Sequence, residues 1–553
     1  MARKDLPPEP MTVRDAMSGS LAKYWYAGMI KEVNSMVSQD TWQETVRPPN
    51  QKVIKGRWVF QYRFDNDHFL VEFKSRWVIK GYSQTQGVDY DETYAPVARI
   101  QSMRLLICVA VIGHLMLRQL DIKTAFLNSP METICYMEMP DGFEKKNEDG
   151  EILVCLLLKA LYGLHEAARL WYKNYRDTQK KIGWNRCNSD PCLCWIYDKK
   201  SGTRAISGMH VDDSIQASKS TSLLDSLSKE LNAKYQLRVT KEVKYILSIA
   251  VENTSDGIWI SQQAYAEDIL RGIGLWDNTA TKLTPMMETW KHDDTTPKLS
   301  KEKSTLYRSY LMKLAHLANQ TRPDLSNIVS ILAQHQVDPY ESDLKGLERA
   351  YRYLGGTYNL GLHYSRKDII TTREDQDSLR IPDPKKFLIC YADASHGGTE
   401  ANSRRSQAGY VFLINGTAVT WSSTKIRTIQ ATSSTDSELY SLHNAVKDAK
   451  WCKELLTELG LHGPESLIIY QDNLSTISAA ENPIHRGRLR HIAILQQSIC
   501  DAIEAKEVKL EWCPTNDMVA DIMTKPLRPE LFVKHRNSLG LCTLSAARRE
   551  GTN

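Results

Sequence analysis

The chain has 553 residues, of which 42% are hydrophobic and 25% charged, and its 71 basic and 66 acidic side chains give a net charge of +5. This composition excludes a largely disordered chain, a collagen-like fibre and a small disulfide-bonded scaffold. At roughly 100–200 residues per domain, the length predicts about three domains. The 11 cysteines are scattered and odd in number, which is typical of reduced thiols in an intracellular protein. The mild basic excess permits nucleic-acid binding without requiring it.

The start of the chain and its longest apolar run both argue against membrane segments. The first residues, MARKDLPPEP, lack the apolar core of a secretory signal. The run Leu105–Leu117 is shorter than the roughly 20 apolar residues that cross a bilayer, so it predicts a buried helix. Polar or Pro-rich stretches at 6–10, 287–303 and 365–386 divide the chain, and the residues after Pro529 predict a frayed tail.

Strand-like and helix-like patterns alternate between the first two of these stretches. β-branched and aromatic residues predict strands at Lys52–Tyr62 and Phe73–Gly81, and apolar periodicity predicts helices at Ser102–Leu117 and Ala167–Lys181. After residue 386 the patterns predict, in order, three strands, a helix, a strand, two helices and a strand, at 387–393, 409–415, 417–422, 434–459, 466–471, 473–480, 490–505 and 507–512. Hairpin strands followed by helices and further strands make a mixed α/β domain. We therefore predict two globular units joined by a bridging segment.

Two adjacent acids, Asp212 and Asp213, lie between two short segments that alternate with period 2, which predicts a hairpin turn. Asp121 lies in an earlier strand-like segment, and a neighbouring strand would bring it to the same end of a sheet. Three converging carboxylates repel one another unless divalent cations lie between them, and hard oxygen ligands select Mg²⁺. For an isolated Asp-Asp pair, a polar turn is the more common explanation.

Longer motif blocks make the prediction more specific, and they follow one another over almost the whole chain. The principal blocks are KSRWVIKGYSQTQGVDYDETYAPVAR (74–99), QLDIKTAFLN (119–128), LYGLHEAARLWY (161–172), HVDD (210–213), YADAS (391–395), SSTDSELYSL (433–442), QDN (471–473) and VADIMTKPL (519–527). In these blocks and their order the chain resembles the reverse transcriptase and RNase H portion of a copia-type LTR-retrotransposon Pol polyprotein.

The resemblance implies an α/β (α+β) fold, in which a right-hand polymerase of fingers, palm and thumb precedes an RNase H-like mixed α/β domain. The implied divisions are a lead-in (1–40), the fingers, palm and early thumb (41–286), the thumb and connection (287–386), the RNase H-like domain (387–530) and a tail (531–553). The implied activities are RNA- and DNA-directed DNA synthesis and cleavage of RNA in RNA–DNA hybrids.

The same resemblance implies the partners. These are an RNA template, a DNA or RNA primer, the RNA–DNA hybrid and dNTPs, with the integrase and capsid proteins of the element as further partners and no membrane. It implies an intracellular site of action, in cytoplasmic virus-like particles and in the nucleus.

The resemblance also assigns site residues. Asp121 and Asp212 would bind two Mg²⁺ ions, for which Mn²⁺ is a substitute, and Asp213 would complete the cluster. A second pair of ions, which orients water against an RNA phosphodiester, would be held by Asp393, Glu438, Asp472 and Asp521. Around the incoming dNTP, the resemblance assigns to Phe126 the exclusion of a 2′-hydroxyl. It also places three basic residues there, Lys74, Arg76 and Lys80, and two further contacts, Tyr162 and Gly163. Considered without the family, the three basic residues would more often form a solvated strand.

Two other groups are open to more than one interpretation. Cys187, Cys192 and Cys194 lie close together, but no second Cys/His pair follows at zinc-ligand spacing, so we predict no zinc site. His485 and His491 lie in a basic segment that resembles the family's H-x-R-x-K-H-I block, for which phosphate contacts and a structural role are equally plausible.

The sequence departs from the family pattern at several positions. His210 replaces a tyrosine, Glu166 a glutamine, Ala168 a proline and Ser248 a glycine. None of these removes a metal ligand, but Glu166 is expected to add negative charge near the template and dNTP, so the efficiency of the polymerase is in question more than its chemistry.

These departures leave two alternatives to an active enzyme: a non-catalytic relic that only binds nucleic acid, and a chain in which RNase H is active and the polymerase is dead. Retention of all seven carboxylates favours the enzyme. The chain begins with Met1 just upstream of the polymerase region and shows no capsid, aspartic-protease or integrase motif, which fits a processed product, a designed chain or a surviving open reading frame.

Overall fold

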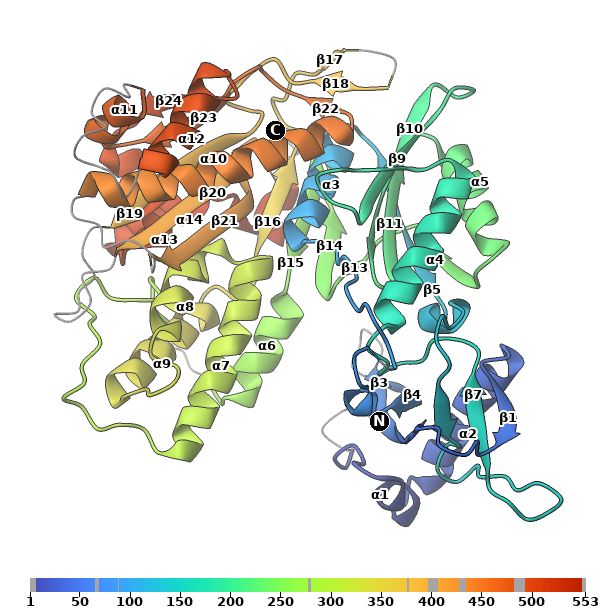
Figure 1. The fold of residues 1–553 in the computed structure, drawn as a ribbon. Coiled ribbons are helices and arrows are strands. Elements are labelled where there is room, and N and C mark those ends of the chain that lie inside the picture. Colours follow the sequence, from blue (N-terminus) through green and yellow to red (C-terminus); the bar gives the residue numbers. More distant parts are fainter. Residues whose placement is uncertain are drawn as a thin grey trace.

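The computed structural model describes residues 6–64, 69–87, 89–276, 280–374, 377–395, 406–426, 434–481 and 493–549. His485 and His491 therefore lie outside the described residues. In Figure 1 the N-terminal segments occupy one side of the molecule, the C-terminal segments occupy the other, and helix α3 lies between them. Among the described helices, none combines the length and the apolar character needed to cross a membrane.

An aromatic-rich hairpin dominates the N-terminal region. Its strands β3 (Gly56–Phe64) and β4 (Leu70–Ile79) pair antiparallel, with Trp58 opposite Trp77, so both predicted strands are confirmed. Helix α2 (Ala22–Ser38) packs on β4. The remaining elements of this region are α1 (Val13–Ser18) and the sheet β1-β7-β6-β2, with β1 (Trp42–Val46), β2 (Val53–Ile54), β6 (Tyr136–Glu138) and β7 (Leu153–Leu157).

The second sheet has six strands in the order β12-β5-β11-β10-β9-β8. Its strands are β5 (Met116–Ile122), β8 (Asn185–Arg186), β9 (Leu193–Asp198), β10 (Thr203–His210), β11 (Asp213–Ser218) and β12 (Leu237–Thr240). Helices α4 (Ala167–Ile182) and α5 (Thr221–Asn232) pack against each other beside it. The predicted helix at 167–181 and the hairpin around Asp212 are thus confirmed.

The apolar run that predicted a helix at 102–117 is divided between two elements. Helix α3 (Ile100–Ile112) ends at Gly113, because His114 adopts a left-handed backbone conformation with φ of 53°. The chain then turns, and Met116 begins β5. The prediction of one helix through Leu117 was wrong, since an apolar run does not distinguish a buried helix from the buried strand that follows it.

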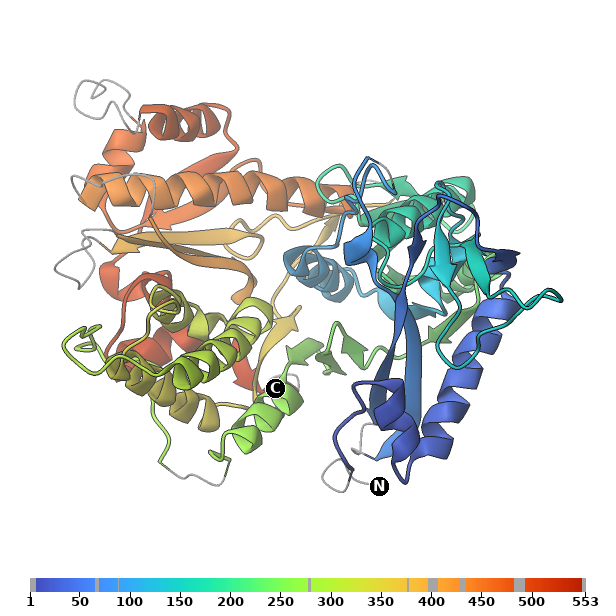
Figure 2. The ribbon, with the colours of Figure 1, turned by 60° about the horizontal axis from the view of Figure 1, so that its bottom comes forward.

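The C-terminal sheet matches its predicted element order. Strands β21, β20 and β19 pair antiparallel, and β23 and β24 add parallel to them, giving the order β21-β20-β19-β23-β24. The elements, each within a few residues of its prediction, are β19 (Ile389–Ser395), β20 (Gln407–Ile414), β21 (Thr417–Lys425), α10 (Ser434–Glu458), β23 (Leu467–Gln471), α11 (Leu474–Glu481), α12 (Ala493–Glu504) and β24 (Val508–Trp512). Figure 2 shows the long helix α10 lying along this sheet.

A third assembly joins the two sides. Its sheet has the order β13-β14-β15-β16-β25, and a small sheet has the order β17-β18-β22. The strands are β13 (Tyr245–Ile246), β14 (Ile249–Asn253), β15 (Gly257–Ser261), β16 (Leu360–Ser365), β17 (Thr372–Arg373), β18 (Leu379–Arg380), β22 (Leu461–His462) and β25 (Leu541–Thr543). The helices are α6 (Gln263–Gly272), α7 (Lys301–Gln320), α8 (Ser326–Ala333) and α9 (Glu341–Gly355).

The residues after Pro529 are folded, so the prediction of a frayed tail was wrong. They form α14 (Pro529–Ser538), β25 and α15 (Leu544–Arg549), and β25 pairs with β16. Phe532 of α14 is buried and packs edge-on against Tyr353. A strand paired with a partner so far away in sequence leaves no local pattern of its own, which is why composition alone suggested disorder here.

Helix α3 connects the two sides through a continuous core. Every side chain from Ser102 to Ile112 is buried, and α3 packs on β10, β15, β16, β21 and α10. Arg104 donates from Nε to the carbonyl oxygen of Val419 at 2.7 Å, and its guanidinium lies 3.9 Å from the ring centre of Trp421. The predicted bridging segment is therefore not the only link between the halves, because α3 anchors one to the other.

We expect His535→Gln to weaken the dependence of the free energy of unfolding on pH in the acidic range. His535 on α14 is 1% exposed, and burial lowers its pKa to about 4. The unfolded histidine takes up a proton near pH 6.5 and the folded one only near 4, so the parent loses stability as the pH falls between these values. Glutamine does not titrate. Between pH 7 and 4, the free energy of unfolding measured with urea should therefore fall by about 1–3 kcal/mol less in the variant than in the parent. Identical pH profiles would contradict this assignment.

Two candidate carboxylate centres

The first centre lies at one end of the six-stranded sheet. In the β11–β5 ladder Asp213 lies directly opposite Asp121, and cross-strand partners hold their Cβ atoms about 4.5–5.5 Å apart. Asp212 occupies the turn between β10 and β11, and its carbonyl oxygen accepts a hydrogen bond from the Ile122 amide at 3.2 Å. The structure thus brings together the three acids that the sequence pattern placed there.

Electrostatics of this centre match converging carboxylates. Burial raises the pKa of Asp213, the charges of Asp212 and Asp121 raise it further, and a hydrogen bond from Gln119 opposes the shift. That bond runs from Gln119 Nε2 to Asp213 Oδ1 at 2.9 Å. Gln119 lies two residues before Asp121 on β5, so both side chains point to the same face. Like charges held together in this way favour the binding of a divalent cation.

An aromatic corner lies beside the first centre. The rings of Phe126 and Tyr162 meet edge to face with centroids 4.7 Å apart, and the Arg76 guanidinium lies 5.5 Å from the Tyr162 centroid. Burial raises the pKa of Tyr162, Arg76 lowers it, and the Asp212 carboxylate raises it. Three of the six residues expected around a dNTP therefore lie next to one another and within electrostatic range of the acidic turn.

The other three expected dNTP residues have different surroundings. Burial lowers the pKa of Lys74, which lies near Glu32 as well as Arg76. Lys80 lies close enough to Asp141 to lower the pKa of that carboxyl, which burial raises. Gly163 has φ of 100°, and a Cβ there would lie 2.1 Å from the Ile79 carbonyl oxygen. Glycine is thus required for close packing of this loop against β4, which is a structural role.

The departures at positions 166 and 248 acquire local explanations. Glu166 is buried and accepts hydrogen bonds from Thr133 at 3.0 Å and Gln84 at 3.4 Å. Its carboxylate is therefore hydrogen-bonded within the protein, and the expectation that it adds charge near the template and dNTP stays a prediction. Ser248 has φ of 66° in the two-residue turn between β13 and β14. Glycine favours this conformation, so the serine costs local strain without touching either centre.

The second centre lies where β19, β23 and α10 meet. Asp393 comes from β19, Glu438 from α10, and Asp472 follows β23. One carboxylate oxygen from each lies within 4.8 Å of the others. Asp521 begins α13 (Asp521–Thr524), which packs on β19 and β20. The structure therefore gathers the second predicted quartet as well.

A cation and two polar side chains complete the second centre. Lys525 Nζ lies 2.8 Å from Asp521 Oδ1 and 3.8 Å from Asp393 Oδ2. The Thr524 hydroxyl donates a hydrogen bond to Asp393. Gln471, which is fully buried, donates to Glu438 at 3.4 Å, and its side-chain oxygen accepts from the Asp472 amide at 3.0 Å.

Three of the acids of this centre, Glu438, Asp472 and Asp521, have a pKa raised above that of an isolated carboxyl. Burial raises the pKa of Glu438, and the charges of Asp393 and Asp472 raise it further. Burial and Asp393 raise the pKa of Asp521 to about 7, against the opposing effect of Lys525. Such a set of hard oxygen donors, destabilised by its own repulsion, fits Mg²⁺.

Several supporting residues were missed by sequence reasoning. Their signals were nevertheless present for Gln119, which shares a strand face with Asp121, and for Lys525, which lies four residues after Asp521. Gln471 precedes Asp472 in a block that was recognised only for its acid. For Trp171, which donates to the Val211 carbonyl at 2.6 Å, no local pattern announces the contact.

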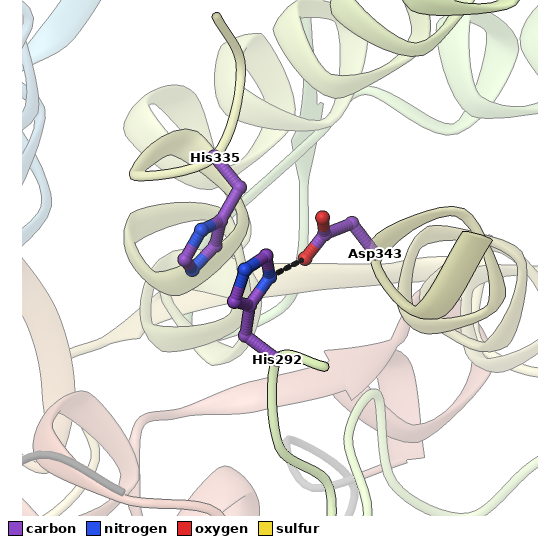
Figure 3. A group of neighbouring side chains, drawn as sticks. All are labelled: His292, His335 and Asp343. Atoms are coloured by element: carbon purple, nitrogen blue, oxygen red, sulfur yellow. Dashed lines mark hydrogen bonds and ion pairs between the residues drawn. The ribbon is translucent and has the colours of Figure 1, made fainter. Parts of the chain in front are cut away.

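Figure 3 shows a third group of potential ligands, whose residues belong to neither centre. His292 Nδ1 is 2.9 Å from Asp343 Oδ1, and the rings of His292 and His335 stack with centroids 3.8 Å apart and an interplanar angle of 7°. A metal ion lies close to the plane of each imidazole that binds it, and no point lies in two parallel planes. The observed arrangement is thus a stacked, hydrogen-bonded cluster and does not fit a metal ion bound by both imidazoles.

Comparisons with known proteins identify relatives of this chain. Residues 39–288 match the family model described as reverse transcriptase (RNA-dependent DNA polymerase). The chain is 31% identical to the retrovirus-related Pol polyprotein from transposon RE1 of Arabidopsis thaliana, over 96% of this chain and 34% of that protein. It is 30% identical to the putative transposon Ty5-1 protein YCL074W of Saccharomyces cerevisiae, over 60% of this chain and 100% of that protein.

The chain therefore belongs to the retrovirus-related Pol polyproteins of copia-type transposons and contains their reverse transcriptase region. It spans about a third of the length of the RE1 polyprotein. Among solved structures, a foamy viral protease-reverse transcriptase in complex with double-stranded DNA aligns with a TM-score of 0.45 and 11% identity, over 88% of this chain and 69% of that one.

Proposed function

We propose that this chain is the reverse transcriptase and RNase H of a retrotransposon. It extends a primer on RNA and DNA templates at the first carboxylate centre, and it cleaves the RNA strand of RNA–DNA hybrids at the second. The observation that carries the proposal is the pair of separate acidic centres. The first joins Asp121 and Asp213 across β5 and β11, the second gathers acids from strands and helices, and in each the carboxylate charges raise the pKa of a neighbouring acid. Family membership supplies the reaction class.

At the first centre, Asp121 and Asp212 would hold Mg²⁺, with Asp213 beside them and Mn²⁺ as a substitute. Bound ions of this kind neutralise the charge that develops on attacking and leaving oxygens in phosphoryl transfer. Gln119 orients Asp213 through its hydrogen bond. Arg76 lies over Tyr162, where its charge can neutralise a triphosphate as pyrophosphate leaves.

At the second centre, Asp393, Glu438, Asp472 and Asp521 would hold the metal ions. Gln471 orients Glu438 by donating to its carboxylate. The side-chain oxygen of Gln471 accepts a hydrogen bond from the backbone amide of Asp472 and so supports that residue as well. Lys525 balances the charge of Asp521 and Asp393. These contacts hold the acids ready to align a water molecule with an RNA phosphodiester.

Two assays on the full chain test the proposal. With Mg²⁺ and dNTPs, we expect extension of a DNA primer on an RNA template, and with a labelled hybrid we expect cleavage of its RNA strand. EDTA should abolish both. Cleavage without extension would support a chain in which only RNase H is active, and binding of the hybrid with neither reaction would support a nucleic-acid-binding relic.

Phe126→Ala is expected to weaken discrimination against ribonucleotides. The ring of Phe126, fixed against Tyr162, fills the space that a 2′-hydroxyl would need. Its removal should raise kcat/KM for rNTP relative to dNTP about 10–100-fold, the range open to steric discrimination. Single-nucleotide incorporation measures this ratio. Phe126→Tyr, which keeps the ring, is the matched control, and equal ratios for alanine and tyrosine would contradict this role.

A further inference from the structure

The tip of the β10–β11 hairpin has an unusual backbone. Val211 has φ of 57°, a left-handed conformation that is strained for a β-branched residue. Such strain costs of order 1–3 kcal/mol and persists only where the surroundings determine the conformation. The residue that follows is Asp212, so the orientation of this turn sets where the acidic side chains point.

The turn is held from two sides. On one side, strand β5 contacts the turn through a hydrogen bond from the Ile122 amide to the Asp212 carbonyl oxygen at 3.2 Å. On the other side, helix α4 contributes Trp171, whose indole Nε1 donates to the Val211 carbonyl oxygen at 2.6 Å. This second bond satisfies the polar group of the strained residue itself.

The Trp171 indole is itself fixed in place. It is 1% exposed and meets Tyr175 and Tyr235 with ring centroids 5.4 Å away in each case. The Tyr235 hydroxyl lies 2.7 Å from Thr178 Oγ1 on the next turns of α4. The indole therefore has little freedom, and its N–H has a defined direction toward the turn.

From these contacts we propose that Trp171 is a positioning residue for DNA synthesis. Its indole N–H holds Val211 in the left-handed conformation and thereby sets the orientation of Asp212 and Asp213. The proposal rests on the polymerase activity proposed above. Because α4 begins shortly after Tyr162, the same helix connects the aromatic corner with the acidic turn.

The test compares Trp171→Phe with Trp184→Phe in the full chain. Both substitutions remove a buried indole N–H, but within the described residues the Trp184 N–H has no hydrogen-bond partner. For Trp171→Phe we expect kcat of RNA-templated extension to fall about 10–100-fold, the range for a misplaced reacting group, with KM for dNTP changed less than threefold. Hybrid cleavage should stay within twofold, and Trp184→Phe should match the parent.

A second measurement separates this inference from the proposed function. Hydrogen–deuterium exchange of the peptide that covers 203–218 should be faster in Trp171→Phe than in the parent, whether or not the chain extends primers. Unchanged exchange and unchanged kcat in Trp171→Phe would overturn the inference, as would equal losses in both tryptophan variants. A parent that extends no primer, with exchange still accelerated by Trp171→Phe, would overturn the proposed function and leave the positioning contact supported.

Discussion

Substituting Asp212 by asparagine is expected to lower the rate of RNA-templated DNA synthesis by about 10³-fold or more, because a neutral amide neither holds a divalent cation nor balances its charge. Asparagine keeps the size of the side chain. The turn is held through its carbonyl oxygens, which accept from the Ile122 amide and the Trp171 indole, so the fold should remain. Primer extension under single-turnover conditions measures the loss, and the same preparation should cleave a labelled hybrid at the rate of the parent.

Glu438→Gln is the reciprocal control. Its side chain lies in the second centre, against Asp393, Asp472 and Gln471, and the variant should lose hybrid cleavage while it keeps primer extension. Together the two variants form a double dissociation. If each variant lost both activities in parallel, the two acidic centres would not be separate sites and the proposed division of function would be wrong.

The C-terminal sheet was predictable from sequence because its signals are local. The apolar strand at 387–393 and the helix at 434–459 are each indicated by the pattern of their own residues. The pairing of β25 with β16 carries no such signal, since residues 541–543 meet residues 360–362 only in the folded chain. For the same reason the end of α3 was missed, because the left-handed His114 is recognised only from the backbone.

The candidate sites follow the same division. The three acids of the first centre could be placed because a hairpin and a neighbouring strand leave few alternatives. The surroundings of the basic residues and of Glu166 could not be predicted from the sequence. For Glu166 the reason is that its hydrogen-bond donors, Thr133 and Gln84, come from separate segments of the chain. A buried carboxylate with two donors and an exposed one read identically in sequence. Charges that motif reasoning places at a substrate thus need the tertiary structure before a role is assigned.

A buried ion pair anchors the start of the α8 segment. Arg322 and Asp324 are 2% and 1% exposed, and they form a bidentate pair with distances of 2.9 Å and 2.7 Å. Arg322 also donates to the Thr357 carbonyl oxygen at 2.8 Å, and the Tyr353 hydroxyl donates to Asp324. Burial alone would raise the pKa of Asp324, but the Arg322 guanidinium lowers it below its ordinary value.

Asp324→Ala is therefore expected to destabilise the chain by about 3–5 kcal/mol, because it leaves the Arg322 charge buried without a counter-ion. Urea unfolding followed by circular dichroism measures the change. Asp338→Ala provides the matched control, since Asp338 pairs with Lys298 at the surface, and exposed pairs contribute only about 0–1 kcal/mol.

The double variant Arg322→Met with Asp324→Leu distinguishes the cause of this loss. If the unpaired charge is responsible, removal of both charges should recover a large part of the stability that Asp324→Ala loses, because apolar side chains of similar volume replace buried ion pairs at little cost. If instead the hydrogen bonds to Thr357 and Tyr353 dominate, the double variant should be at least as unstable as Asp324→Ala.

The lowered pKa of Asp324 also predicts how the difference in stability between parent and Asp324→Ala depends on pH. The contribution of the pair is present above the ordinary carboxyl pKa of about 4 and is lost as the pH falls through the folded value, so the gap between parent and Asp324→Ala should narrow only in strong acid.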